Sequence, residues 1–330
     1  IPVFVDVDPQ TFCLDPKKIE EKISNKTKAL LAVHLMGNVA NIDEIKKICK
    51  KYNLKFIEDT AQAPGAKYKN KYLGTFGDAG IISLQQSKNI MTGEGGIILT
   101  NKKEIAKKCR LIINHGEVIY DKNASLNELE NIIGCNFRMT ELTAAIGIAQ
   151  LKKLDKVNSI RKKNSIYLRK KLKIFKGLEM PIFQDDYNKK YKIYPHIFVM
   201  KYDKEIYKVS RDIFVAALRA EGIPVGTGYV RPMYSNPTFL KKIAFGKKGC
   251  PWTCNKSNVS YAEGMCPISE NLLNNEFLWF YHIAYSSNQK DMDDIFKAIN
   301  KICKNLDHLK SIKIKNISKL AYKGQDKLKL

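Results

Sequence analysis

The chain has 330 residues, of which 44% are hydrophobic, and a formal net charge of +24 at pH 7. This length exceeds what one compact core usually holds and predicts two domains. The basic charge raises the question of a nucleic-acid ligand. However, only seven of the 57 basic residues are arginine, and the lysines are scattered over all the predicted helices. We therefore predict no specific nucleic-acid partner, with the basic tail from residue 309 as the one segment suited to a weak polyanion contact.

The chain shows no sign of a membrane span or of secretion. No apolar run reaches about 18 residues, and the apolar opening soon meets charged residues, so neither a transmembrane helix nor a signal peptide is expected. The eight cysteines are spread thinly along the chain, which predicts reduced thiols rather than disulfides. A soluble, cytoplasmic protein is the expectation.

One local cysteine cluster leaves a zinc site open as an alternative. It consists of Cys250, Cys254 and Cys266, with His282 as the candidate fourth ligand. The paired spacing that is typical of structural zinc is absent. We favour buried or loop thiols and expect no metal.

The first half alternates short β-rich runs with helical patterns, which predicts a mostly parallel sheet sandwiched by helices. Asp15 and Pro16 are expected to start a short helix that ends near Ile23, and Asn41 to start a helix with Ile42, Ile45, Ile48 and Cys49 on one face. A further helix is expected at residues 102–111. The predicted strands are residues 2–8, 29–36, 54–59, 77–84 and 95–100.

The second half has a different pattern. Apolar residues at helical spacing predict one or two long helices over residues 140–173, and a strand is expected at 194–202. Helices follow at residues 210–221 and 291–305. We therefore predict an α/β large domain, residues 1–160, and a smaller C-terminal α+β domain, residues 161–330, which ends in the basic tail.

Lys88 stands between an apolar strand and a glycine-rich turn in the stretch SLQQSKNIMTGEGG, residues 83–96. Ligands of open α/β sheets bind at the carboxyl ends of strands, and Asp59 sits at another such end. A lysine and a carboxylate there suggest pyridoxal 5′-phosphate, whose aldehyde bonds to the amine while the carboxylate keeps the ring nitrogen protonated. A Walker-type loop is excluded because its glycines precede the lysine. On the local pattern alone, an ordinary solvated lysine stays open.

Three blocks carry a resemblance to a known family. They are EDTAQAPGA at residues 58–66, SLQQSKNIMTGEGG at 83–96 and GCNFRMTELTAAIGIAQL at 134–151. Together with VHLMGN at 33–38 and NHGE at 114–117, they make the chain resemble the DegT/StrS family. The resemblance implies a fold-type I, pyridoxal-phosphate-dependent aminotransferase that acts mainly on keto sugars and related rings.

The resemblance assigns roles to five residues that match motif positions. Lys88 becomes the lysine that bonds to the cofactor aldehyde, Asp59 the partner of the pyridine nitrogen, and Gln62 a contact of the ring or its hydroxyl. Ser83 would bind the phosphate, although a strand-end serine that caps a turn explains it as well. Asn136 would reach the phosphate of the neighbouring subunit's cofactor, which makes a homodimer with shared active sites a requirement.

Four further residues match the motifs with less defined roles. Glu94 would contact the substrate or support Lys88. Arg138 would either pack or form an ion pair. His34 and His115 match motif positions, and a structural role explains each of them at least as well.

The implied reaction is amino transfer. Glutamate or glutamine would give the amino group, a keto sugar or keto cyclitol would receive it, and Lys88 would act as the base that moves the proton. Sister sugar dehydratases have histidine at this position, so Lys88 favours amino transfer. The product would serve the biosynthesis of amino sugars, cell-surface polysaccharides or secondary metabolites.

The sequence departs from the family pattern in two respects. The chain begins at Ile1, where the family's large domain is already under way. We therefore expect that an N-terminal part with a phosphate-binding turn is missing and that residues 1–330 alone hold the cofactor poorly. The acceptor pocket is expected from residues 229–282, which loosely resemble both enzymes of nucleotide-linked keto sugars and enzymes that aminate keto cyclitols. Lysines near this segment favour a nucleotide-linked sugar, because they could meet its diphosphate.

Two other classes of protein stay open. One is a catalytically silent family member with a binding or regulatory role, which the intact set of cofactor residues opposes. The other is a lysine-rich nucleic-acid binder, which would show salt-sensitive DNA retention without cofactor absorbance.

Overall fold

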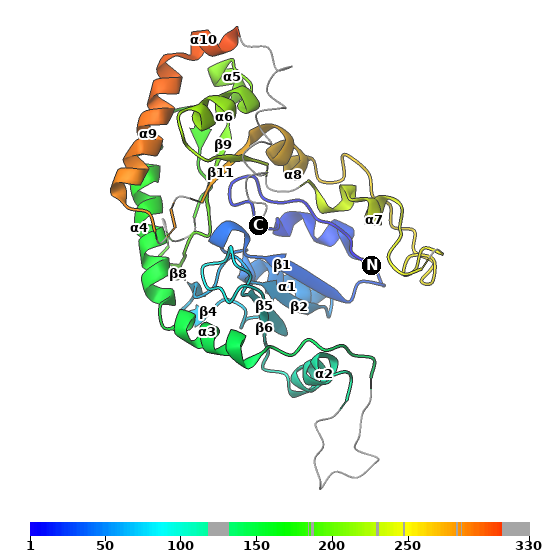
Figure 1. Cartoon of the computed structure of the whole chain (residues 1–330). Helices are drawn as coiled ribbons and strands as arrows, with labels where there is room; N and C mark the ends of the chain where they lie inside the picture. Colours follow the sequence, from blue (N-terminus) through cyan, green and yellow to red (C-terminus); the bar gives the residue numbers. More distant parts are fainter. Residues whose placement is uncertain are drawn as a thin grey trace. The chain divides into compact units, whose positions relative to one another are not determined.

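The structure is a computed structural model that describes residues 1–117, 132–183, 185, 188–228, 231–246, 248–281, 283–284 and 286–311. It divides into two compact units. Unit 1 comprises Ile1–Ser24, Ser159–Phe183 and Pro195–Leu330, and unit 2 comprises Asn25–Asn158 and Gln184–Tyr194. The chain passes from unit 2 into unit 1 within helix α4, Leu154–Leu172 (Figure 1). His282, the candidate zinc ligand, and the basic tail beyond residue 311 lie outside the described residues.

Unit 2 contains a four-stranded sheet in the order β1-β2-β5-β6. β1, β2 and β5 run parallel, and Val33, Asp59 and Ile81 are in register across them. The carboxyl ends of these three strands therefore meet at one edge of the sheet. The strands are β1 (Ala29–Val33), β2 (Lys55–Asp59), β5 (Ala79–Ser83) and β6 (Gly96–Leu99).

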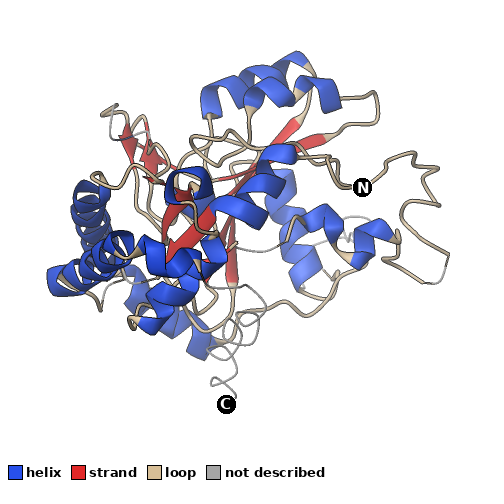
Figure 2. Ribbon diagram, turned by 90° about the horizontal axis from the view of Figure 1, so that it is seen from above, coloured by secondary structure: helices blue, strands red, loops and turns tan. Residues whose placement is uncertain are grey.

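The sequence predicted a mostly parallel sheet, and β6 is its antiparallel strand. β6 pairs with β5 antiparallel, with Ser83 opposite Gly96. The reason is the link between them, residues 84–95, which contains no crossover helix and folds back on itself. The Leu84 N–H donates to the Gly95 carbonyl oxygen (2.9 Å) in this link. Two of the three strand pairings remain parallel, and the fold is mixed α/β (Figure 2).

Helix α1 (Ile42–Lys51) is the crossover between β1 and β2. The Asn41 side chain accepts a hydrogen bond from the Glu44 N–H (3.3 Å), which satisfies one of the free donors of the first turn. Ile42, Ile45, Ile48 and Cys49 are all buried. The predicted cap and the predicted apolar face of this helix are confirmed.

The remaining elements of unit 2 include the helical segments that the sequence predicted. α2 occupies Lys103–Ile113, and the long helical pattern forms α3 (Glu141–Leu151) and α4. A second, small sheet has the order β4-β3-β8. Its strands are β3 (Lys67–Tyr68), β4 (Lys71–Tyr72) and β8 (Tyr191–Lys192).

Unit 1 contains an antiparallel sheet in the order β10-β11-β9-β7. Its buried core includes residues of the sheet and of helices α6 and α9, among them Phe214, Phe280 and Ile299, each 0% exposed. The main elements are β7 (Leu178–Glu179), β9 (Phe198–Tyr202), α6 (Arg211–Ala220), β10 (Gly226–Thr227), β11 (Phe277–Phe280) and α9 (Gln289–Lys304). Short helices are α5 (Lys204–Tyr207), α7 (Pro237–Leu240), α8 (Pro267–Asn271) and α10 (Leu306–Lys310). The described chain also has short turns of 3₁₀-helix at Pro16–Lys18, Glu20–Lys22, Leu35–Gly37 and Met233–Ser235, and a π-helix at Leu272–Glu276.

The strand predicted at residues 2–8 is wrong. Within that segment the structure has only an isolated bridge between Val7 and Leu14. Side-chain contacts hold the segment instead: the Asp6 carboxylate accepts hydrogen bonds from the N–H groups of Ile268 (2.8 Å) and Ser269 (2.9 Å). The helix predicted after Asp15 is also corrected, because it is two short 3₁₀ turns, although Asp15 does cap the first of them.

Two further expectations concern membranes and metals. Across the described ranges, no helix is long and apolar enough to cross a membrane. Within those same residues, no three or more His, Cys, Asp or Glu side chains are grouped so that they could hold a metal ion. Cys266 is buried and Cys254 is exposed, as free thiols.

Candidate active site

Three sequence-predicted residues lie at the edge where parallel strands of unit 2 end. His34 follows β1, Asp59 is the last residue of β2, and Ser83 is the last residue of β5. The strand register fixes this arrangement, because Val33, Asp59 and Ile81 are paired neighbours. The carboxyl edge of a parallel sheet is where open α/β folds bind ligands.

Lys88 lies half-buried in the turn that follows β5. Its backbone N–H donates to the carbonyl oxygen of Gln85 (2.9 Å). Burial lowers the pKa of the Lys88 amine below its ordinary value of 10.5, and the Asp59 carboxylate acts in the opposite direction. The acid singled out by the sequence thus affects the charge state of the lysine singled out by it. An amine with a lowered pKa is deprotonated, and hence nucleophilic, closer to neutral pH than a surface lysine.

The glycine-rich turn after Lys88 reverses the chain. Gly93 and Gly95 adopt positive φ angles of +88° and +143°, a region that side chains rarely occupy. The Thr92 hydroxyl donates to the carbonyl oxygen of Glu94 (2.8 Å), and the Glu94 side chain is exposed. The turn thereby returns the chain to pair β6 with β5.

Ser83 and Gln62 hold the chain near the strand ends. The Ser83 hydroxyl oxygen accepts a hydrogen bond from the Gln85 N–H (3.3 Å) at the start of the lysine turn. Gln62 is buried, and its Oε1 accepts from the N–H of Met36 (2.6 Å), in the turn after β1. Both residues therefore shape the loops that surround Lys88 and Asp59.

His34 has its two ring nitrogens engaged in the interior. Its Nδ1 accepts a hydrogen bond from the Ala40 N–H (3.1 Å), and its Nε2 lies 3.2 Å from Oε2 of Glu58. The side chains of His34 and Glu58 are both 0% exposed. His34 thus has the contacts of a structural histidine.

A second group of sequence-predicted residues gathers around Asn114. Asn136 pairs with Asn114 in an isolated β-bridge, and the Arg138 guanidinium donates to Oδ1 of Asn114 (2.8 Å). The N–H of His115 donates to the carbonyl oxygen of Cys135 (3.1 Å). Asn136 and Arg138 are exposed. Arg138 thus ties the segment that carries Asn136 to the end of α2.

Sequence reasoning missed three buried polar residues that support this edge. Glu58 accepts hydrogen bonds from the N–H groups of residues 74, 76 and 77. Asn89 donates to Asn158, which in turn donates to the carbonyl oxygen of Pro64. Glu58 and Asn89 each adjoin a residue that the motifs did identify, but no spacing rule points to their partners.

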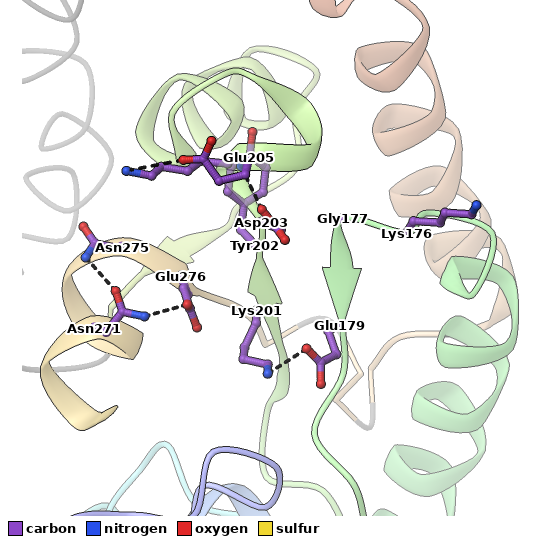
Figure 3. Close-up of a pocket in the computed structure, with 11 residues that line it drawn as sticks. Lys176, Gly177, Glu179, Lys201, Tyr202, Asp203, Glu205, Asn271, Asn275 and Glu276 are labelled. Atoms are coloured by element: carbon purple, nitrogen blue, oxygen red, sulfur yellow. Dashed lines mark hydrogen bonds and ion pairs between the residues drawn. The ribbon is translucent and has the colours of Figure 1, made fainter. Parts of the chain in front are cut away.

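A separate surface pocket of about 350 Å³ lies within unit 1. Lys201 of β9 and Glu179 of β7 point toward one another across it and form an ion pair of 2.7 Å (Figure 3). Asn271 and Glu276, also in its wall, are joined by a hydrogen bond of 2.6 Å. This pocket contains none of the residues expected to hold the cofactor, and Lys201 and Glu179 in its wall neutralise each other.

Comparisons with known proteins agree with the motifs. A family model described as the DegT/DnrJ/EryC1/StrS aminotransferase family matches residues 1–276. The L-glutamine:2-deoxy-scyllo-inosose aminotransferase of Streptoalloteichus tenebrarius is 30% identical over 322 residues, which cover 94% of this chain and 73% of that protein. The GDP-perosamine synthase of Escherichia coli is 43% identical over 154 residues, 47% of this chain and 41% of that protein.

The solved structures give the same result for the fold. The aminotransferase from Psychrobacter cryohalolentis superposes with a TM-score of 0.79 at 25% identity, over 93% of this chain and 76% of that one. The match includes both units, since it covers nearly the whole chain. The chain therefore belongs to the DegT/DnrJ/EryC1/StrS aminotransferase family and is a transaminase.

Proposed function

We propose that this transaminase uses pyridoxal 5′-phosphate to move an amino group from glutamine or glutamate to a ring ketone, within a fold-type I architecture. The interaction between Lys88 and Asp59 carries the proposal. The carboxylate lies at the end of β2, and the half-buried lysine, whose pKa is lowered, lies in the turn that follows the neighbouring strand β5. This is the donor set that the cofactor requires, a nucleophilic amine and an acceptor for the protonated ring nitrogen.

The other residues near the strand ends also fit the cofactor. Ser83 places a hydroxyl at the end of β5, where a phosphate could accept a hydrogen bond from it. Gln62 lies three positions after Asp59 in the following loop, against the turn after β1. We assign Asp59 to the pyridine nitrogen, Ser83 to the phosphate and Gln62 to the ring or its hydroxyl.

Proton transfer in the reaction is assigned to Lys88. When bound, the cofactor supplies an electron-accepting ring that lowers the barrier to removing a proton from the substrate carbon. Lys88 would accept that proton on Nζ and give it up again later in the transfer. The lowered pKa of Lys88 suits this work, because a base is most effective when its pKa lies near the operating pH.

The acceptor is proposed to be a keto cyclitol or a keto sugar. The scyllo-inosose aminotransferase matches 94% of this chain, and hence both units, whereas the perosamine synthase matches 47% of it. The longer match makes a keto cyclitol the first acceptor to test, with a nucleotide-linked keto sugar as the second. Glutamine is the donor in the printed name of the cyclitol enzyme and is the first donor to test.

We further propose a homodimer in which Asn136 serves the partner's active site. Asn136 is exposed, and the helix that follows it, α3, has an apolar surface with no buried residue. The exposed apolar side chains on α3 and just before it are Phe137, Met139, Leu142, Ile146, Ile148 and Leu151. Exposed apolar side chains gathered on one short segment are typical of interaction sites in soluble proteins.

The central test traps the cofactor on the chain. Excess pyridoxal phosphate is added, the sample is reduced with borohydride, and the pyridoxyl-modified peptide is mapped by mass. We expect the label at Lys88, its loss in Lys88→Arg, and its retention in Lys55→Arg, which changes an exposed lysine at the start of β2. Label spread over many lysines would contradict the enzyme proposal.

A second assay distinguishes the remaining alternatives. Glutamine and glutamate are each supplied with a keto cyclitol or a nucleotide-linked keto sugar, and the amino product is measured by mass. A labelled Lys88 with no product from any pair would favour a silent family member. DNA retention that is lost with salt, without cofactor absorbance, would favour the nucleic-acid binder.

A further inference from the structure

Asn158, near the start of α4, connects two loops that carry candidate cofactor residues. The Asn89 side-chain Nδ2 donates to Oδ1 of Asn158 (2.9 Å), and Nδ2 of Asn158 donates to the carbonyl oxygen of Pro64 (2.9 Å). Asn89 directly follows Lys88 in the turn after β5. Pro64 lies in the loop that starts at Asp59. One side chain therefore joins the lysine turn to the acid loop.

This connection is buried. Asn158 is 0% exposed and Asn89 is 5% exposed, so water cannot replace the lost bonds without opening the structure. We call the two bonds from Asn89 to Asn158 and from Asn158 to Pro64 the relay. The relay needs a carboxamide at position 158, because that group accepts at its oxygen and donates at its nitrogen. Aspartate, which has the same size, would lack the donor for Pro64, and alanine would lack both groups.

The backbone of the acid loop is adapted to this contact. Gly65 has a φ of +81°, and a Cβ added to it would lie 3.0 Å from Nδ2 of Asn158. A glycine there allows α4 and the loop to approach closely. The hydrogen bond from Asn158 to Pro64 thus depends both on the Asn158 carboxamide and on the small size of Gly65.

We propose that Asn158 is a positioning residue for Lys88, which holds the lysine turn against the loop that carries Asp59 and Gln62. The inference rests on the proposed function, because it assigns Asn158 to the geometry of the cofactor site. Without the bonds of Asn158 to Asn89 and Pro64, the turn is held less firmly to α4, and the Lys88 amine gains access to water. Among the described residues, Asp59 is the charged group that acts on this amine.

The experiment measures Lys88 in the cofactor-free chain. Competitive labelling with acetic anhydride over a range of pH, followed by mass analysis, gives the pKa of each lysine. Hydrogen exchange of residues 60–66 and 85–92 reports on the two loops. The variants are Asn158→Ala and the control Asn164→Ala. Asn164 is also buried on α4, but it donates to the carbonyl oxygen of Ser287 in unit 1.

We expect Asn158→Ala to raise the pKa of Lys88 toward its ordinary 10.5, because the amine becomes hydrated. Exchange in both loops should accelerate about tenfold, as expected for the loss of a buried hydrogen bond. Asn164→Ala should change neither quantity while lowering overall stability. If the two variants leave Lys88 and the loops equally unchanged, the proposal is wrong.

A second variant covers the case in which Asn158→Ala does not fold. Asn89→Ala removes the donor next to Lys88 and keeps the bond between Asn158 and Pro64. It should raise the pKa of Lys88 and loosen residues 85–92 alone, and an unchanged Lys88 there overturns the inference. These measurements use no cofactor, so a failure of the pyridoxyl label at Lys88 would count against the proposed function without altering them.

Discussion

Glu58 and His34 form a hydrogen-bonded pair in the interior of unit 2, with 3.2 Å between Oε2 of the carboxylate and Nε2 of the ring. Because Nδ1 of His34 accepts from the Ala40 N–H, the ring proton lies on Nε2 and is donated to Glu58. The same carboxylate accepts from the N–H groups of Gly74, Phe76 and Gly77 (2.9, 2.6 and 2.8 Å). One acidic side chain thus fixes the loop between β4 and β5 to the end of β1.

Glu58→Gln should destabilise the protein strongly. The amide places a donor where the native carboxylate accepts four hydrogen bonds, so at least one buried N–H loses its acceptor. We expect the free energy of unfolding in urea to fall by about 3 kcal/mol. Glu44→Gln, which removes an exposed carboxylate paired with Lys47, should change it by less than about 0.5 kcal/mol. Equal effects of the two variants would contradict this role of Glu58.

The same carboxylate predicts a loss of stability in acid. Burial alone would raise the pKa of Glu58, but the hydrogen bonds from His34, Gly74 and Gly77 outweigh it, and the pKa lies below the ordinary 4.5. A lowered folded-state pKa gives stability that is complete above 4.5 and lost as the pH falls through the folded value. The urea midpoint should therefore decrease below pH 4.5, and less steeply in Glu58→Gln. Parallel pH profiles would show that other groups cause the loss.

Asp59→Asn should lower the pKa of Lys88 further. The Asp59 charge favours the protonated amine, and its removal leaves the desolvation that already lowers the pKa. Competitive labelling of the cofactor-free chain measures the effect, with Asp43→Asn as the control, since Asp43 pairs with Lys69. A Lys88 pKa that rises, or that responds equally to both changes, would contradict the interaction at the strand ends.

Gly80→Ala should destabilise the central sheet. A Cβ at Gly80 would lie 2.2 Å from the carbonyl oxygen of Gly74, a backbone atom that cannot move aside easily. We expect a loss of about 3 kcal/mol in urea unfolding. Gly96→Ala in β6 is the matched control, because its nearest contact would be 3.4 Å from the Ile82 oxygen. Similar stability of the two variants would show that the sheet accommodates the methyl group.

Leu142→Asp should dissociate the proposed homodimer. Leu142 is 81% exposed in the first turn of α3, where an acidic side chain does not oppose the helix. Sedimentation should give a dimer for the native chain and a monomer for the variant. Leu240→Asp, at a 52% exposed leucine of α7, should remain a dimer. A monomeric native chain would refute the assignment of α3 to a subunit interface.

Local signals explain which elements could be predicted. Asn41 and the apolar spacing after it specify α1 without help from distant residues. The strand at residues 2–8 failed because its alternation satisfies the β pattern, while the partners that fix it lie far along the chain. Phe4 packs on Tyr234, Phe239 and Tyr261, and none of these contacts leaves a trace in nearby sequence.

The residues of the candidate site likewise fall into those that the sequence identifies and those that it does not. The lysine, the acid and the glycine-rich turn belong to short motifs, so their sequence identifies them. The supporting residues do not, because Asn158 acts on a turn 69 positions earlier and Glu58 binds backbone groups that have no sequence signature. Buried hydrogen-bond partners of this kind could therefore be identified only from the structure.

The bonds from Asp6 to Ile268 and Ser269 join parts of unit 1 that are up to 263 positions apart. Unit 2, in contrast, takes most of its residues from one continuous stretch, Asn25–Asn158. During synthesis, the first segment of unit 1 must wait until its partners leave the ribosome, whereas the strands and α1 of unit 2 are already available to pair. Within residues 1–330, the order of translation therefore favours folding of the unit 2 sheet before unit 1.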